Sequence, residues 1–150
     1  MIMDFARSTP KDAKGIAMLE EEIFSDPWRE CDITATVSQY GAMCYTASEG
    51  GRVIAYILGR VIAPEGEIYR IATAPDKRRR GIAYRLLDYA IKTERGRGLE
   101  SLFLEVRKNN TPARNLYRAY GFREIGIRKN YYKNPPDDAV VMLHANKADL

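Results

Sequence analysis

The six residues Arg78-Arg79-Arg80-Gly81-Ile82-Ala83 decide how the rest of this chain is interpreted. An apolar run typical of a strand precedes them at residues 67–74, and an amphipathic run typical of a helix follows at residues 82–94. The first N–H groups of a helix have no partner within it, and the helix dipole adds partial positive charge there. Gly81 lets a ligand approach the backbone, and three arginines add charge. The pattern predicts an anion-binding turn, although a solvated basic loop fits these six residues equally well.

The composition is that of an ordinary soluble globular protein. The chain has 150 residues, of which 45% are hydrophobic and 29% charged, and we expect one domain over residues 1–150. No apolar run approaches the roughly 18 residues of a membrane span, and residues 1–10 lack the apolar stretch of a signal peptide. Cys31 and Cys44 have no metal-like spacing. We therefore expect a reduced, cytoplasmic protein without a membrane partner.

The charge pattern narrows the class of ligand. The net charge is +4, and basic residues concentrate at 77–80, which suits a small phosphorylated ligand as well as a polyanion. Aromatic and basic residues are not interleaved as they are in proteins that bind single-stranded nucleic acid, so we expect no nucleic-acid partner. His144 is the only histidine, which excludes a multi-histidine zinc site, and we expect no metal. We interpret His144 as structural.

Hydrophobic periodicity predicts a mixed α/β order, β-α-α-β-β-β-α-β-α-β-β. The expected strands are 3–8, 42–48, 52–61, 67–74, 101–107, 122–128 and 139–144. Four helices are expected. The first begins after residues 8–10, and a second, short one ends near Ser38. The third spans residues 82–94, and the fourth runs from an N-cap at Thr111 to Gly121. The step from strand 67–74 through helix 82–94 to strand 101–107 predicts a right-handed parallel crossover. Ligands bind beyond the carboxyl ends of such strands, where the arginine turn falls.

Several motifs in this order resemble those of the GCN5-related N-acetyltransferase (GNAT) family. Arg78-x-x-Gly81-x-Ala83 is similar to that family's pyrophosphate-binding signature, and Ile71-Ala72-Thr73 resembles the strand whose backbone holds the pantetheine arm. The resemblance covers essentially the whole chain. It implies a mostly antiparallel central sheet with a parallel, splayed central strand pair and flanking helices, and acetyl-CoA as co-substrate. The cofactor-binding residues that it implies are Ile71, Ala72, Thr73, Arg78, Arg79, Arg80, Gly81, Ile82, Ala83, Tyr84 and Asn110.

The resemblance is closer to the branch of the family that acetylates protein N-termini. Residues 24–28 resemble that branch's substrate-side loop, and residues 104–122 resemble its most recognisable stretch. Thr73 departs from the usual branched aliphatic residue, and Arg70 stands where the bacterial alanine-acetylating enzymes commonly have Asn. The resemblance implies a protein or peptide N-terminus as acceptor, with a ribosomal protein as one candidate, and a monomer or dimer.

Glu105 is the first candidate for the general base that the reaction needs. Strand alternation places it on one face with Phe103 and Arg107, where partial burial would raise its pKa toward neutrality. A plain ion pair with Arg107 or Arg70 is the alternative. Glu67, on the preceding strand, is the second candidate.

Alternation would put Glu67 on the face that carries Tyr69, Ile71 and Thr73. The two carboxylates could act together, one of them through a water molecule. A strand-end ion pair is the alternative interpretation of Glu67.

Tyr117 is the residue that the resemblance implies as the acid for the departing CoA sulfur. A phenol with a pKa of about 10 suits a thiolate whose acid has a pKa of about 8.5. Asn110 is implied as a CoA contact, with a helix-start role as the alternative. Tyr120 is expected to pack in the core.

The acceptor side is expected to carry aromatic residues. Tyr131 and Tyr132 follow Asn130 in a predicted polar loop, and Tyr131 and Trp28 are predicted to line a groove for an extended peptide. An α-amine, with a pKa of about 7.7–8.0, is easier to deprotonate than lysine, at about 10.4. The alternatives are an enzyme for a small amine or polyamine, a non-catalytic CoA-binding module, and a nucleic-acid-binding protein using residues 77–80.

Overall fold

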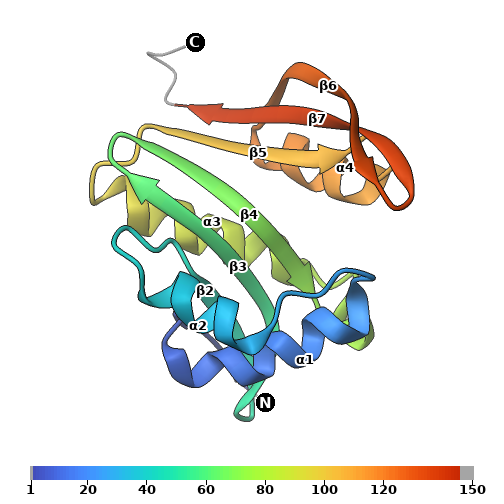
Figure 1. The fold of residues 1–150 in the computed structure, drawn as a ribbon. Coiled ribbons are helices and arrows are strands. Elements are labelled where there is room, and N and C mark those ends of the chain that lie inside the picture. Colours follow the sequence, from blue (N-terminus) through green and yellow to red (C-terminus); the bar gives the residue numbers. More distant parts are fainter. Residues whose placement is uncertain (1, 146–150) are drawn as a thin grey trace.

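A seven-stranded sheet extends through the molecule and carries helices on both faces (Figure 1). The computed structural model describes residues 2–145. The strands are β1 (Met3–Arg7), β2 (Tyr45–Glu49), β3 (Arg52–Ile62), β4 (Glu65–Thr73), β5 (Ser101–Arg107), β6 (Arg123–Lys133) and β7 (Pro136–Ala145). The helices are α1 (Ala13–Ile23), α2 (Glu30–Ser38), α3 (Ile82–Arg95) and α4 (Thr111–Tyr120), with single 3-10 turns at Pro10–Asp12 and Pro75–Lys77. The predicted order of strands and α-helices is confirmed.

The sheet has the strand order β1-β2-β3-β4-β5-β7-β6. Every neighbouring pair is antiparallel except β4 and β5, which are parallel and joined through α3. The predicted mixed, mostly antiparallel sheet with one parallel crossover is therefore confirmed.

The parallel pair is splayed. β4 and β5 pair only where Glu65–Ile68 lies beside Ser101–Leu104, and beyond this register the two strands diverge (Figure 1). The divergence lies toward their carboxyl ends, where β4 passes into the arginine turn and β5 into α4. It opens the sheet next to the predicted anion site.

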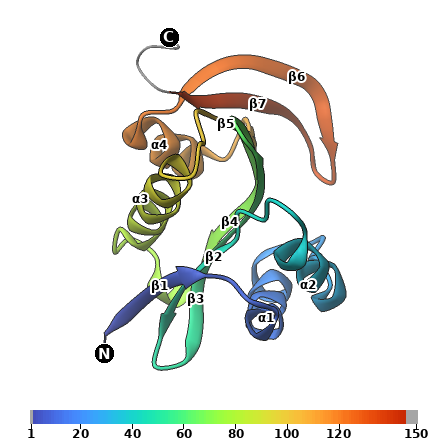
Figure 2. The same ribbon diagram turned by 90° about the vertical axis from the view of Figure 1, so that its left-hand side faces the viewer.

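The helices form two layers. Helices α1 and α2 cover one face of the sheet, while α3 and α4 cover the other (Figure 2). The predicted amphipathic helix α3 buries its apolar face at Leu86, Leu87 and Ile91, and α1 buries Ile16 and Leu19. Burying apolar area on both faces, at about 25 cal/mol per Å², stabilises this arrangement.

The start of α4 differs from the prediction by one residue. Asn110, not Thr111, is the N-cap, and its Oδ1 accepts a hydrogen bond from the Ala113 N–H at 3.2 Å. Thr111 is already helical. The prediction failed because Asn and Thr are both good N-caps and stand side by side.

The last hairpin is longer than predicted. Residues 129–132 belong to β6 and not to a polar loop, although the pairing with β7 is irregular between Arg128 and Tyr132 and Asn130 has a positive φ of 53°. Nearly every residue of β6 is exposed, so the strand lacks the apolar alternation that would have revealed it.

Two further properties of the described residues bear on function. Within residues 2–145, no helix is long and apolar enough to cross a membrane. The same part of the chain holds no group of three or more His, Cys, Asp and Glu side chains that could bind a metal ion. His144 packs against Phe122 and Tyr120, and its Nδ1 lies 2.7 Å from Nη2 of Arg95, which agrees with a structural role.

Candidate active site

A cavity of about 690 Å³ lies between the carboxyl end of β4 and the first turns of α3 and α4. All the cofactor-binding residues predicted from the sequence line it except Arg80, which is exposed elsewhere on the turn. Lys77, Pro112, Ala113 and Leu116 also line this cofactor cavity and were not predicted as contacts. Their places beside the arginine turn and on the α4 face after Asn110 were the available signal.

The arginine turn is built to receive an anion. Gly81 is the N-cap of α3 with a φ of 73°, and Arg79 also has a positive φ, of 65°. The hydrogen bonding of α3 begins with the Arg85 N–H, which donates to the Gly81 carbonyl at 3.1 Å. The N–H groups of the residues just before Arg85 therefore have no carbonyl partner within the helix. A Cβ at Gly81 would meet nothing within 4 Å, so glycine is needed for its backbone angle. The free N–H groups and arginines therefore suit a diphosphate.

A second cavity, of about 290 Å³, lies where β4 and β5 diverge. One wall comes from the segment after α1, including Phe24 and Asp26, and the other from β5 and the β6–β7 hairpin. This acceptor cavity and the cofactor cavity share lining residues Ile23, Phe24, Ile71, Asn110, Ala113 and Tyr117. A group bound in one cavity can thus reach a group bound in the other.

A bulge in β4 changes which side chains share a face. One residue of β4, Tyr69, is left out of the register with β3, so alternation along β4 is interrupted there. Glu67 consequently shares its face with Arg70 and not, as predicted, with Ile71 and Thr73. The pairs that establish this are Tyr56 with Ala72, Leu58 with Arg70 and Arg60 with Glu67.

The two candidate bases lie on the same face of the sheet. Glu67 pairs across the parallel register with Phe103, and Glu105 follows two residues later. Glu105 lines the acceptor cavity and forms an ion pair with Arg128, at 3.1 Å, and not with either arginine expected from the sequence.

Glu67 lies just outside the acceptor cavity. It lines a neighbouring shallow hollow. Partial burial, with a smaller contribution from the nearby Glu105 charge, raises the pKa of Glu67 above its ordinary value. The site therefore pairs one ion-paired carboxylate with one that is easier to protonate.

Tyr117 stands at the junction of the two cavities. Its side chain is buried, with 4% exposure, yet it lines both. Burial, with a smaller effect of Tyr132, raises the pKa of the Tyr117 hydroxyl well above its usual value. The hydroxyl therefore keeps its proton at neutral pH. Asn110 also lines both cavities while capping α4, so the helix-start role does not remove it from the cavity walls.

The predicted aromatic pair does not line the acceptor cavity. Trp28 packs against Tyr69, with ring centroids 6.2 Å apart, and Tyr131 lies beside the Arg128 guanidinium at 4.7 Å. Their near neighbours Asp26 and Tyr132 line the cavity instead.

Arg107 was predicted to share the face of Glu105 and, in the alternative interpretation, to form an ion pair with it. Its Nη1 donates to the Pro135 carbonyl at 2.7 Å, and its guanidinium stacks over Tyr132 at 4.2 Å. Arg107 therefore holds the β6–β7 hairpin against β5 on one side of the acceptor cavity.

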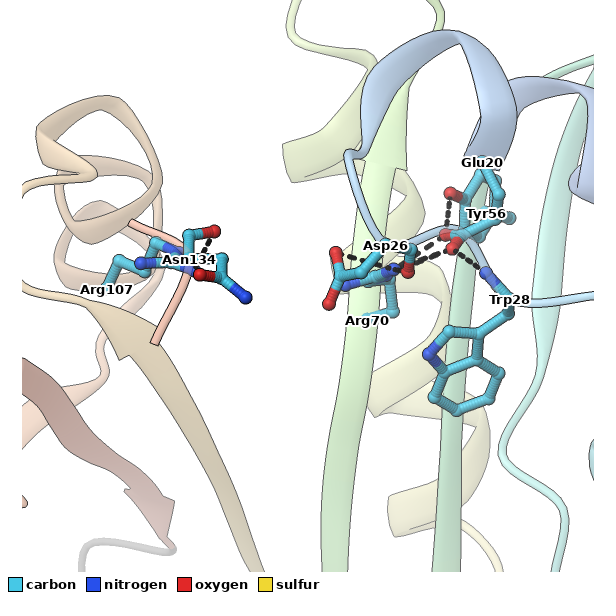
Figure 3. A network of polar contacts seen from close by, with 7 residues as sticks. All are labelled: Glu20, Asp26, Trp28, Tyr56, Arg70, Arg107 and Asn134. Atoms are coloured by element: carbon cyan, nitrogen blue, oxygen red, sulfur yellow. Dashed lines mark hydrogen bonds and ion pairs between the residues drawn. The ribbon is translucent and has the colours of Figure 1, made fainter. Parts of the chain in front are cut away.

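On the other side lies a polar network that the sequence analysis missed (Figure 3). Glu20, on α1, is fully buried and contacts both Tyr56 and Arg70. The available signal was its position: Glu20 lies four residues after Ile16 and three before Ile23, which places a carboxylate on the apolar face of α1.

Comparison with known proteins identifies this arrangement. Residues 13–122 match the family model described as acetyltransferase (GNAT) family. The chain is 31% identical over 126 residues to the [ribosomal protein bS18]-alanine N-acetyltransferase of Escherichia coli K12, covering 83% of this chain and 84% of that protein. It is 34% identical over 140 residues to the N-alpha-acetyltransferase RimI of Mycobacterium tuberculosis, covering 89% and 87%. The crystal structure of the ribosomal-protein-S18-alanine N-acetyltransferase from Escherichia coli superimposes with a TM-score of 0.88 at 27% identity, covering 97% of each chain.

Proposed function

This chain belongs to the acetyltransferase (GNAT) family, and we propose that it transfers acetyl from acetyl-CoA to the N-terminal α-amino group of a protein or peptide. Relatives that are 31–34% identical carry names for this reaction, and one of them is named for the alanine of ribosomal protein bS18. A ribosomal protein is therefore one candidate acceptor. The proposal includes a cytoplasmic location, where new protein N-termini are made.

One observation carries the proposal: the cofactor cavity and the acceptor cavity meet at Tyr117. A long donor molecule can lie in the first cavity while an amine enters through the second. This arrangement supports direct transfer in a ternary complex, without a covalent enzyme intermediate.

The cofactor cavity fits acetyl-CoA. The N-terminus of α3, with Gly81 and the adjoining arginines, would hold the pyrophosphate, and the backbone of residues 71–73 would align the pantetheine arm. Acetyl-CoA supplies an acetyl thioester, whose carbonyl carbon the acceptor amine attacks directly.

Glu105 is proposed as the general base, assisted by Glu67. Glu105 lines the acceptor cavity, so its carboxylate can take the amine proton directly or through water. Glu67 has a raised pKa and lies on the same face, which suits it to share that proton. An α-amine with a pKa of about 8 needs only a modest base near neutral pH.

Tyr117 is proposed as the general acid. The hydroxyl carries its proton at neutral pH, as any phenol with a pKa of about 10 or above does, and its place between the cavities is where the carbon–sulfur bond would break. The hydroxyl proton passes to the departing sulfur, and the proton taken from the amine balances it.

Release of free CoA from acetyl-CoA, followed against a panel of short peptides with different N-terminal residues, tests the proposal. We expect turnover that depends on the first residues and disappears when the same peptide is already N-acetylated. Spermidine and other polyamines form a second arm of the panel. Turnover of polyamines with no response to any peptide would overturn the peptide assignment, and no release with any amine would indicate a CoA-binding module.

A further inference from the structure

The buried carboxylate of Glu20 joins a helix, two strands and a loop. Its Oε1 accepts from the Trp28 backbone N–H at 2.9 Å and from Nη2 of Arg70 at 2.7 Å, while its Oε2 accepts from the Tyr56 hydroxyl. Glu20 is 0% exposed. A buried carboxylate is tolerated only when its hydrogen bonds are satisfied. One of its partners, Arg70, lines the acceptor cavity.

Arg70 connects this carboxylate to the loop that walls the cavity. Its Nη2 also donates to the Asp26 carbonyl at 3.0 Å, and its guanidinium stacks over Phe24 at 3.7 Å. The loop is therefore held at Phe24 and Asp26 by Arg70 and at Trp28 by Glu20. Figure 3 shows Arg107 and Asn134 across from this group, and residues of both groups line the acceptor cavity.

We propose that Glu20 is a positioning residue for acceptor binding. It fixes Arg70 and the segment 24–28 as one rigid wall of the acceptor cavity, and it balances the positive charge that Arg70 brings to that wall. This inference rests on the proposed function in one respect: it takes the molecule bound against this wall to be the acceptor.

The location of the network separates its effect on the two substrates. Phe24 lines both cavities, whereas Arg70, Asp26 and the neighbouring Ser25 line the acceptor cavity but not the cofactor cavity. A loosened wall therefore raises the KM for the acceptor, whereas the KM for acetyl-CoA and kcat stay near their original values. Loss of the Glu20 charge leaves Arg70 with only the exposed Asp26 carboxylate, 3.9 Å away, as a counter-charge. Acceptors with basic residues near the N-terminus should therefore lose more than those with acidic residues.

The test compares Glu20→Gln with a control variant, Glu94→Gln. Glu94 is also a buried carboxylate in contact with a tyrosine and an arginine. It lies away from both the acceptor cavity and the cofactor cavity. We expect Glu20→Gln to raise the KM for the best peptide by about tenfold or more and that for acetyl-CoA less than about twofold. Two versions of the peptide, with Lys or Glu at the third position, should then differ in KM by a larger factor with Glu20→Gln than with the original protein. Equal effects of the two variants, or parallel rises in both KM values, would overturn the proposal.

Hydrogen exchange of the segment 24–29 supplies a readout that needs no acceptor. We expect faster exchange there in Glu20→Gln than in the original protein or in Glu94→Gln. Tyr56→Phe, which removes one bond to the same carboxylate, should give a smaller change in the same direction and serves if Glu20→Gln does not fold. Unchanged exchange in the variant measured would overturn the positioning role. Failure of every acceptor with the original protein would overturn the proposed function alone.

Discussion

Two clusters of identical composition lie in different parts of this molecule. Each joins a buried glutamate on a helix to a buried tyrosine on one strand and an arginine on the neighbouring strand. They are Glu20–Tyr56–Arg70, from α1, β3 and β4, and Glu94–Tyr45–Arg7, from α3, β2 and β1. The first borders the acceptor cavity, and the second lies at the β1–β2 edge of the sheet, where Arg7 and Glu94 line a different cavity.

The clusters differ in the exposure of the arginine and in its contacts outside the cluster. The side chain of Arg70 is 16% exposed and binds a loop carbonyl and an aromatic ring of the cavity wall. The side chain of Arg7 is 41% exposed and donates to the Ala42 carbonyl. The same local chemistry therefore borders the acceptor cavity in one place and the end of α3 in the other. Its role depends on what the surrounding chain brings to it.

A change to the proposed base is expected to have the largest effect on activity, larger than that of any change in the two clusters. Glu105→Gln should lower kcat by about 10²- to 10⁴-fold, because the acceptor proton loses its carboxylate. The affinity for CoA, measured by calorimetry, should stay nearly unchanged, which is the opposite of the acceptor-KM effect expected for Glu20→Gln. An unchanged kcat would remove Glu105 from the role of base.

Truncation of the two glutamates should separate the clusters by stability. Glu20→Ala should reduce the free energy of unfolding by about 3–5 kcal/mol, because it leaves a largely buried guanidinium without its carboxylate. Glu94→Ala should cost less, since water reaches the more exposed Arg7. Urea denaturation of both variants measures the difference. Equal losses would show that exposure of the arginine does not set the cost.

Removal of the two tyrosine hydroxyls should give similar losses of stability but different kinetics. Tyr56→Phe and Tyr45→Phe each delete one hydrogen bond to a buried carboxylate, worth about 1.5–3 kcal/mol. Tyr45→Phe also removes the bond that the hydroxyl accepts from Nη2 of the more exposed Arg7, at 3.0 Å, where water can replace it. Thermal unfolding should report comparable losses, whereas only Tyr56→Phe should raise the acceptor KM. A rise in acceptor KM with Tyr45→Phe would break the functional distinction between the clusters.

The same two tyrosines should make stability fall at high pH. Burial, followed by the hydrogen bond to the glutamate, raises the pKa of Tyr56 and of Tyr45 in the folded protein. An unfolded tyrosine releases its proton near pH 10 while the folded one keeps it, so stability is full below pH 10 and falls above it. Each tyrosine contributes a slope of about 1.4 kcal/mol per pH unit there. Unfolding by urea between pH 9 and 11 should show a shallower decline in each Phe variant, and an unchanged decline would contradict the raised pKa.

The residues that line the proposed cofactor cavity could be grouped almost completely from the sequence, because most of them lie close together in it. Gly81 and its neighbours form one turn between a strand and a helix, and each has its signal in residue type and spacing. The acceptor side depends on distant segments. Glu20 meets Arg70 across fifty positions of the chain, and the bulge at Tyr69 reverses the face of Glu67 relative to Ile71. Neither contact leaves a pattern in local periodicity.

The sequence by itself determined the order of elements, the parallel crossover and the turn Arg78-Arg79-Arg80-Gly81-Ile82-Ala83 at the start of a helix, because helix ends and strand alternation are local properties of the chain. Only the tertiary structure decided that β4 and β5 diverge, that two cavities meet at Tyr117, and which of two chemically equal clusters borders the acceptor cavity. These outcomes follow from the packing of separate elements against one sheet, where burial and register decide which distant side chains meet.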